Sequence, residues 1–167
     1  EIDLIKVCIL DYGSGNVKSV YNLVSFLGYH VTISNERAEI ESATHIILPG
    51  VGSFPKAMKN LQKLNLIDPI EKFISSGKPL MGICLGMQLL FDESEEFKTT
   101  KGLGFVKGKI FLFKKNNEIK ITPHVGWNKL NIIKKNKENN IKLFGKKFIK
   151  EMINENFYFI HSLYIKP

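Results

Sequence analysis

Residues Pro79 to Phe91 read PLMGICLGMQLLF, and this stretch decides the fold. Its first five residues form an almost continuous apolar run, which is typical of a strand buried on both faces. The residues from Leu85 onward suit a helix, so only Cys84 separates the two patterns. A strand that passes at once into a helix indicates the strand–helix alternation of a parallel sheet.

The same alternation covers the first half of the chain. Strands are expected at residues 5–10, 30–33, 44–48 and 79–83, and helices at 17–27, about 54–63, 69–76 and 85–91. We therefore predict an α/β fold with a mostly parallel central sheet flanked by helices. Further strands are expected at 109–113, 119–122, 129–133 and 157–160, in an antiparallel, hairpin-rich second half. Since no long linker interrupts the chain, residues 1–167 are predicted to form a single domain.

Composition excludes several classes of protein. Hydrophobic residues make up 44% and charged residues 24%, which is ordinary for a globular chain and unlike a disordered or collagen-like one. No apolar run approaches the ~18–20 residues that cross a bilayer. The first residues lack the basic segment of a signal peptide, and two cysteines are too few for a disulfide framework. The expected location is the reducing cytoplasm.

The net charge of +8 is unevenly distributed. Residues 1–97 carry 8 Lys or Arg and 12 Asp or Glu, whereas residues 98–167 carry 16 Lys and 4 Glu. Arg37 is the only arginine, and lysines such as Lys134, Lys135 and Lys137 lie in Asn- and Ile-rich sequence. We interpret the basic half as a solvated surface and expect no nucleic-acid partner. Docking on an acidic protein, or a nucleic-acid-binding scaffold, is the alternative.

The segment Gly82-Ile83-Cys84-Leu85-Gly86 has the glycine–nucleophile–glycine spacing of a nucleophile elbow, with cysteine at its centre. Glycines remove Cβ atoms that would clash at such a strained turn. The helix N-terminus favours a thiolate, and the Leu85 amide can donate to an oxyanion. A buried structural cysteine beside two glycines is the alternative. Cys8, inside an apolar strand, is predicted to be a packed core thiol.

A second glycine pair follows the expected strand at 44–48, in the segment Pro49-Gly50-Val51-Gly52-Ser53-Phe54. Loops after the carboxyl ends of parallel strands gather at one edge of a sheet, so this loop should face the Cys84 elbow. Its glycines allow backbone amides to face an anion or oxyanion. An ordinary strand-to-helix turn is the alternative.

Four blocks of sequence, in order, match a known family. They are PGVGSF at 49–54, GICLGMQ at 82–88, PHVGWN at 123–128 and FYFIHS at 157–162. The chain resembles the class I, or triad, glutamine amidotransferases, and among them the glutaminase subunits of imidazole glycerol phosphate synthase. The resemblance extends from Asp11 to the last residue and implies a flavodoxin-like sheet.

The resemblance implies that Cys84 attacks the carboxamide of glutamine, releases ammonia and leaves a glutamyl thioester that water hydrolyses. The implied oxyanion hole consists of the amides near Val51, Gly52 and Leu85. The implied ligands of the glutamine amino-acid moiety are Gln88, Glu96, His161 and Ser162. The implied contacts with a barrel-shaped cyclase subunit, in a heterodimer, are Asn16, Pro123, Trp127 and Asn128. For Glu96 a solvated acid, and for Trp127 a core residue, are the alternatives.

The family pattern is incomplete after the fourth block. The family completes its triad with His-Pro-Glu, and no His-x-Glu follows Cys84 in these 167 residues. We therefore expect a chain that lacks its C-terminal segment and hydrolyses glutamine poorly by itself. His161 could serve as a base, although its block matches the substrate loop. His30 and His45, at strand starts, are expected to be structural.

Two other functions fit part of the pattern. Some bacteria carry a similar glutaminase that supplies ammonia for amidating a surface sugar, and these residues do not separate the two acceptors. A hydrolase or chaperone-like relative with a reactive cysteine fits the elbow but not the 82–88 and 123–128 blocks. No cysteine or histidine pair has metal-ligand spacing and no P-loop occurs, so we expect neither metal nor cofactor. Because no apolar run is long enough to cross a bilayer, we also expect no membrane partner.

Overall fold

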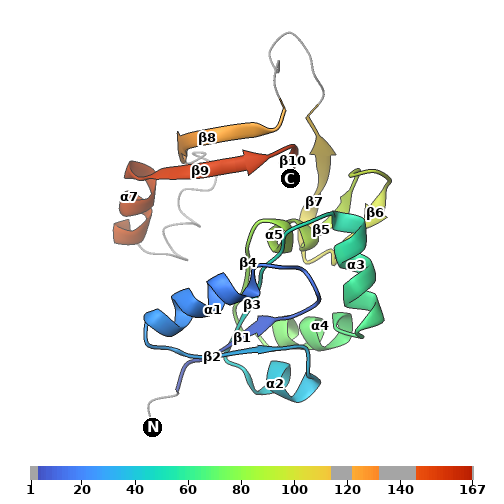
Figure 1. Ribbon diagram of the computed structural model, residues 1–167, viewed down its shortest axis with the longest axis vertical. Coiled ribbons are helices and arrows are strands. Elements are labelled where there is room, and N and C mark those ends of the chain that lie inside the picture. The colour runs from blue at the N-terminus through green and yellow to red at the C-terminus, as the bar shows by residue number, and fades with distance from the viewer. Residues whose placement is uncertain (1–3, 114–121, 132–145, 167) are drawn as a thin grey trace. The chain divides into compact units, whose positions relative to one another are not determined.

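The computed structural model describes residues 4–113, 122–131 and 146–166 (Figure 1). The chain divides into two compact units. The first contains residues 1–112 with 165–167, and the second contains residues 113–164.

The first unit is built on a parallel sheet. Its strands are β1 (Lys6–Leu10), β2 (His30–Ser34), β3 (His45–Leu48) and β4 (Leu80–Gly82), in the order β2-β1-β3-β4. All three strand pairs are parallel, as predicted. The inner strand β1 has Cys8, Ile9 and Leu10 almost fully buried, because a parallel sheet is covered on both faces.

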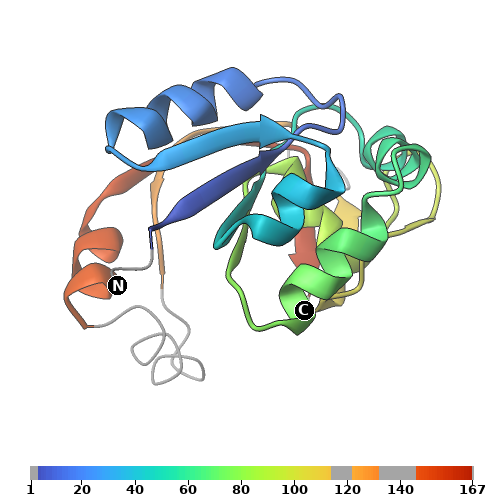
Figure 2. The ribbon, with the colours of Figure 1, turned by 90° about the horizontal axis from the view of Figure 1, so that it is seen from below.

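Within residues 4–113, five helices accompany this sheet. They are α1 (Val17–Phe26), α2 (Arg37–Ser42), α3 (Phe54–Lys63), α4 (Ile67–Ser75) and α5 (Leu85–Leu89). The chain moves from β1 to β2 in one direction and from β2 through β3 to β4 in the other. Right-handed crossovers therefore place α1 on one face and α2 and α4 on the other, as Figure 2 shows. The predicted α/β class is confirmed.

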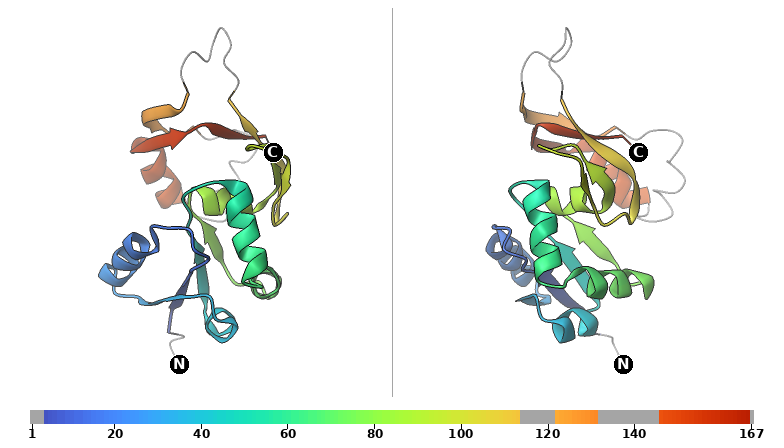
Figure 3. Two further views of the ribbon diagram at one scale, coloured as in Figure 1. Left: turned by 45° about the vertical axis from the view of Figure 1, so that its right-hand side comes forward. Right: turned by 90° about the vertical axis from the view of Figure 1, so that its right-hand side faces the viewer.

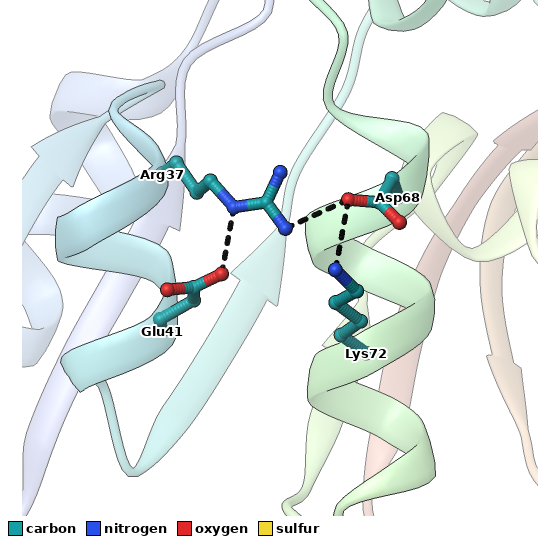
Figure 4. Close-up of polar contacts among 4 residues, drawn as sticks. All are labelled: Arg37, Glu41, Asp68 and Lys72. Atoms are coloured by element: carbon teal, nitrogen blue, oxygen red, sulfur yellow. Dashed lines mark hydrogen bonds and ion pairs between the residues drawn. The ribbon is translucent and has the colours of Figure 1, made fainter.

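Helix α2 belongs to this sheet region but was not predicted from the sequence. It has six residues and a single buried side chain, Ile40, so no apolar repeat marks it. Arg37 connects it to α4: its Nε lies 2.7 Å from Glu41 Oε1 and its Nη2 lies 2.8 Å from Asp68 Oδ2 (Figure 4). Lys72 lies 3.5 Å from the same Asp68 oxygen. Because all four side chains are exposed, these ion pairs contribute little to stability.

A second sheet follows α5. It contains β5 (Phe91–Ser94), β6 (Thr100–Lys101), β7 (Val106–Leu112) and β10 (Leu163–Lys166), in the order β10-β7-β5-β6. Strand β5 is antiparallel to β6 and parallel to β7. The prediction that helix continues to residue 91 is wrong, because α5 ends at Leu89 and Phe91 pairs with Val106 of β7. That pairing depends on a partner strand distant in sequence, which local periodicity does not reveal.

The second unit contains an antiparallel pair of strands, β8 (His124–Lys129) and β9 (Asn156–His161), and the helix α7 (Lys146–Asn154). The two strands lie side by side in Figure 3 (orange and red). The expected strand at 129–133 is wrong in its described part, since β8 lies before it and ends at Lys129. Residues 119–121 and 132–133 of the expected strands lie outside the described residues.

In the part of the chain that the structure describes, no helix combines the length and apolar character needed to span a bilayer.

Candidate active site

Cys84 occupies the turn between β4 and α5. Its backbone has φ 53° and ψ −115°, in a region that residues other than glycine rarely adopt. Its side chain is exposed, whereas Cys8 is only 1% exposed. The alternative of a buried structural cysteine at position 84 is therefore wrong. A strained, solvent-facing cysteine directly before a helix is the geometry of a nucleophile elbow.

The two cysteines should differ sharply in reactivity. Burial raises the pKa of the Cys8 thiol, which reduces its thiolate fraction and adds to its steric protection. We expect the native chain to show one fast thiol per molecule in a titration with Ellman's reagent, and two after unfolding. The Cys84→Ser variant should lose the fast thiol and Cys8→Ala should retain it. A fast Cys8 in the folded chain would contradict its burial.

The glycines flanking Cys84 are required by close backbone packing. A Cβ on Gly82 would lie 2.5 Å from Met87 Cα and 2.7 Å from Met87 N. A Cβ on Gly86 would overlap the carbonyl oxygen of Leu48, at the end of β3. That carbonyl also accepts a hydrogen bond from Ile83 N at 3.0 Å. The elbow is therefore held directly against the carboxyl end of the neighbouring strand.

The loop at 49–52 packs against the same elbow, as the sequence predicted. A Cβ on Gly50 would overlap the Tyr12 hydroxyl and lie 3.1 Å from Gly86 N. The buried Tyr12 hydroxyl donates to the carbonyl oxygen of Pro49 at 2.7 Å. Burial raises the pKa of this hydroxyl, so it stays protonated and remains a donor. The loop is thereby fixed at the edge of the sheet where Cys84 lies.

Ser14 is a residue of this site that the sequence analysis missed. Its Oγ accepts a hydrogen bond from Val51 N at 2.9 Å and donates one to Val51 O at 3.0 Å. The Val51 amide is therefore occupied by Ser14 in this structure.

The Leu85 amide is the first of α5, where helix amides have no partner within the helix. Gly52, at φ 113°, has open space where a Cβ would stand.

A small hollow of about 60 Å³ adjoins this loop. It is lined by Gly13, Ser14, Val51, Gly52, Ser53, Lys56, Ala57 and Asn60. Its N-terminal side was not predicted from the sequence, because the Gly13-Ser14-Gly15 segment carries no motif of its own.

Two of the predicted glutamine ligands also lie in the first unit. Gln88 is half-buried on α5, and its backbone N–H donates to the backbone carbonyl of Cys84 at 3.1 Å. The Glu96 carboxylate accepts a hydrogen bond from Phe54 N, the first residue of α3, at 2.7 Å. Glu96 is thus half-buried at the end of the 49–54 loop, and the alternative of a solvated acid is wrong. An acid at a helix N-terminus is also favoured by the helix dipole.

The remaining predicted ligands lie in the second unit. His161 ends β9, with its Nε2 2.9 Å from His124 Nδ1 and its Nδ1 2.7 Å from Leu163 O. Both ring nitrogens of His161 therefore have partners within this unit. Ser162 follows, and its carbonyl accepts from Phe113 N at 2.9 Å.

The predicted partner-binding residues are exposed. Trp127 is 69% exposed and packs its ring against Tyr158, at 5.4 Å between centroids, so the alternative of a core residue is wrong. Pro123 and Asn128 are exposed in the same unit. Asn16 is exposed in the first unit, where it precedes α1 with φ 72°.

Val125 and Ile160, which pair across the two strands, extend the apolar surface around Trp127.

The other histidines lie away from the elbow. His30 and His45 are the first residues of β2 and β3, at the amino edge of the parallel sheet, whereas Cys84 follows the carboxyl end of β4. His45 Nδ1 lies 2.9 Å from Thr44 Oγ1, which supports a structural role. Among the described residues, no three His, Cys, Asp or Glu side chains gather as a metal site.

A cysteine elbow at the carboxyl edge of a helix-flanked parallel sheet defines a class of α/β enzymes that act through a nucleophile. The sequence profile described as "Glutamine amidotransferase class-I" matches residues 8–167, and the chain belongs to this family.

Two relatives with curated descriptions show which kind of protein within this family the chain is similar to. The chain is 50% identical over 107 residues to "Imidazole glycerol phosphate synthase subunit HisH 2" of Vibrio vulnificus (strain YJ016), covering 63% of this chain and 50% of that one. It is 47% identical over 105 residues to subunit HisH of Lactococcus lactis subsp. lactis (strain IL1403), covering 63% and 52%. The chain spans about half the length of these curated relatives.

A solved structure agrees on the fold. The "Crystal structure of glutamine amidotransferase" superposes with a TM-score of 0.59 at 18% identity, over 74% of this chain and 62% of that one.

Proposed function

We propose that this chain is part of a glutaminase that hydrolyses glutamine through Cys84 and passes the ammonia to a synthase partner making imidazole glycerol phosphate. The observation that carries the proposal is the exposed, positive-φ cysteine beside the 49–52 loop. Membership of the class I family and the similarity to HisH subunits support the choice of substrate and acceptor.

The chemistry follows from the position of the sulfur. Cys84 Sγ attacks the carboxamide carbon of glutamine, the C–N bond breaks, and the nitrogen leaves with the thiol proton as ammonia. The Leu85 amide donates to the oxyanion that forms on the carbonyl oxygen. Val51 and Gly52 supply further amides, and for Val51 this requires its bond to Ser14 to be exchanged for one to the substrate. Water then hydrolyses the thioester to glutamate.

The ends of glutamine require charged and polar partners. We assign the substrate ammonium to Glu96 and Gln88, because a carboxylate pairs with an ammonium. Phe54 N occupies one oxygen of Glu96, which fixes the orientation of the carboxylate. His161 and Ser162 would hold the substrate carboxylate.

The described histidines do not offer Cys84 a free base. Both ring nitrogens of His161 and of His124 are hydrogen-bonded, and His30 and His45 begin strands at the opposite edge. We infer that these 167 residues alone hydrolyse glutamine slowly, because loss of the triad base lowers the rate by several orders of magnitude.

The partner is proposed to be the barrel-shaped cyclase subunit, in a heterodimer with this protein in the cytoplasm. An exposed Trp–Tyr pair on a sheet surface supports such an interface, since aromatic residues are enriched where proteins bind one another. Asn16, Pro123, Trp127 and Asn128 are the proposed contacts.

The acceptor can be tested in the source organism. Deleting the gene should create a requirement for histidine that the intact gene relieves. A strain that grows without histidine but loses an amidated surface sugar would instead establish the second acceptor. The purified partner should also form imidazole glycerol phosphate from glutamine only when this protein is added.

A further inference from the structure

The second unit contains a continuous chain of hydrogen-bonding side chains, and its central member, His124, has no part in the proposed chemistry. Asn128 Nδ2 lies 3.0 Å from His124 Nε2, and His124 Nδ1 lies 2.9 Å from His161 Nε2. His161 Nδ1 lies 2.7 Å from the carbonyl oxygen of Leu163. The chain therefore begins at an exposed amide on β8 and ends at the backbone just after Ser162.

Only one placement of protons satisfies these contacts when the rings are neutral. A carbonyl oxygen can only accept, so His161 Nδ1 carries hydrogen and His161 Nε2 is an acceptor. His124 Nδ1 must then donate to it, which leaves His124 Nε2 as an acceptor. The Asn128 amide NH₂ fills that last position. Both imidazoles are therefore held as Nδ1–H tautomers.

The rings are also held sterically. His161 packs against Phe113, at 5.3 Å between centroids, and against the edge of His124 at 5.0 Å with an 89° angle. Phe113 N in turn donates to Ser162 O. The orientation of His161 and the turn at 161–163 are thus parts of one packed arrangement.

The orientation of the Asn128 amide is coupled to the direction of this hydrogen-bond chain. If its amide turned to present oxygen to His124, His124 would have to donate from Nε2 and accept at Nδ1. His161 would then donate from Nε2, and its Nδ1 lone pair would face the Leu163 carbonyl. That reversal removes the bond that closes the 161–163 turn.

We propose that Asn128 and His124 are positioning residues that hold His161 and the 161–163 turn. In this proposal the orientation of the Asn128 amide determines whether the hydrogen bond from His161 to the Leu163 carbonyl, which closes the turn, can form. The hydrogen-bond chain itself is independent of the proposed function, but its consequence for catalysis rests on that function. There, Asn128 is a proposed partner contact, and His161 and Ser162 are proposed glutamine ligands. A partner that reorients Asn128 would thereby alter the glutamine end of the site.

The test is the tautomeric state of each imidazole in the free 167-residue chain. It uses long-range ¹⁵N–¹H spectra at about pH 8.5, where imidazole is ordinarily neutral. Signals are assigned with single His→Gln variants. We expect His124 and His161 both as Nδ1–H tautomers. An Nε2–H tautomer at His161 would overturn the proposal without any variant.

Asn128→Asp tests the switch, because a carboxylate offers His124 only acceptors. We expect His124 to gain an Nε2–H signal and the amide resonances of Ser162 and Leu163 to shift. Asn156→Asp is the matched control, since it adds the same charge to the opposite face of the same two strands and should leave both rings unchanged. An Asn128→Asp spectrum with both rings and the turn unchanged would overturn the coupling.

These measurements need neither glutamine nor a partner. Failure of the glutaminase proposal would therefore leave the expected spectra intact, and failure of the spectra would leave glutamine hydrolysis untouched.

Discussion

Replacing Cys84 with serine should reduce glutamate release from glutamine by at least about a thousandfold, because removing a nucleophile of a concerted site typically costs 10⁴–10⁶ in rate. Serine preserves the shape of the elbow, but its hydroxyl is far harder to ionise than a thiol. The expected loss is therefore one of chemistry rather than of folding. The assay is glutamate production by the full-length protein with its proposed partner at saturating glutamine.

Two controls separate chemistry from structure. The Cys84→Ser complex supplied with ammonium salts should still form product, because the partner's own reaction needs ammonia and not the thiol. Cys8→Ala, which removes the other sulfur, should hydrolyse glutamine at close to the wild-type rate. Hydrolysis that survived in the Cys84→Ser protein would refute the assignment of the nucleophile.

The second large effect is expected from Gly86→Ala. The added Cβ would overlap the carbonyl oxygen of Leu48, and because this is backbone against backbone, no side-chain rotation can relieve it. Helix α5 would have to move away from β3, carrying Cys84 with it. We expect a loss of about 3 kcal/mol in the free energy of unfolding, at the upper end for overpacking. For a chain of this size that corresponds to a fall in Tm of about 6–12 °C.

Urea unfolding of the purified chain measures this loss directly. Gly15→Ala is the matched control, because its Cβ would meet only Val51 Cγ2, at an ordinary 3.5 Å. That variant should remain within about 0.5 kcal/mol of wild type, as expected where no special contact is disturbed. Equal stability of the two variants would show that α5 does not pack on the end of β3.

The features of this protein that depend on neighbouring residues were predictable from the sequence. They are the buried strands, the helices that follow them and the Cys84 elbow. The 49–52 loop could be placed beside Cys84 because parallel strands end at a common edge. Helix α2 and strand β5 were not predictable, since one is too short to show periodicity and the other exists through pairing with β7.

Within the candidate site the same division applies. The sequence alone predicted Cys84 as the candidate nucleophile and identified the glycines that its turn needs, because a strand–turn–helix corner is a property of consecutive residues. Only the tertiary structure decided that Ser14 occupies the Val51 amide, that Glu96 binds the start of α3, and that two histidines share a directed hydrogen-bond chain. These contacts join residues 37 or more positions apart. Side chains of ordinary polar type gain such partners only when folding brings distant backbone together.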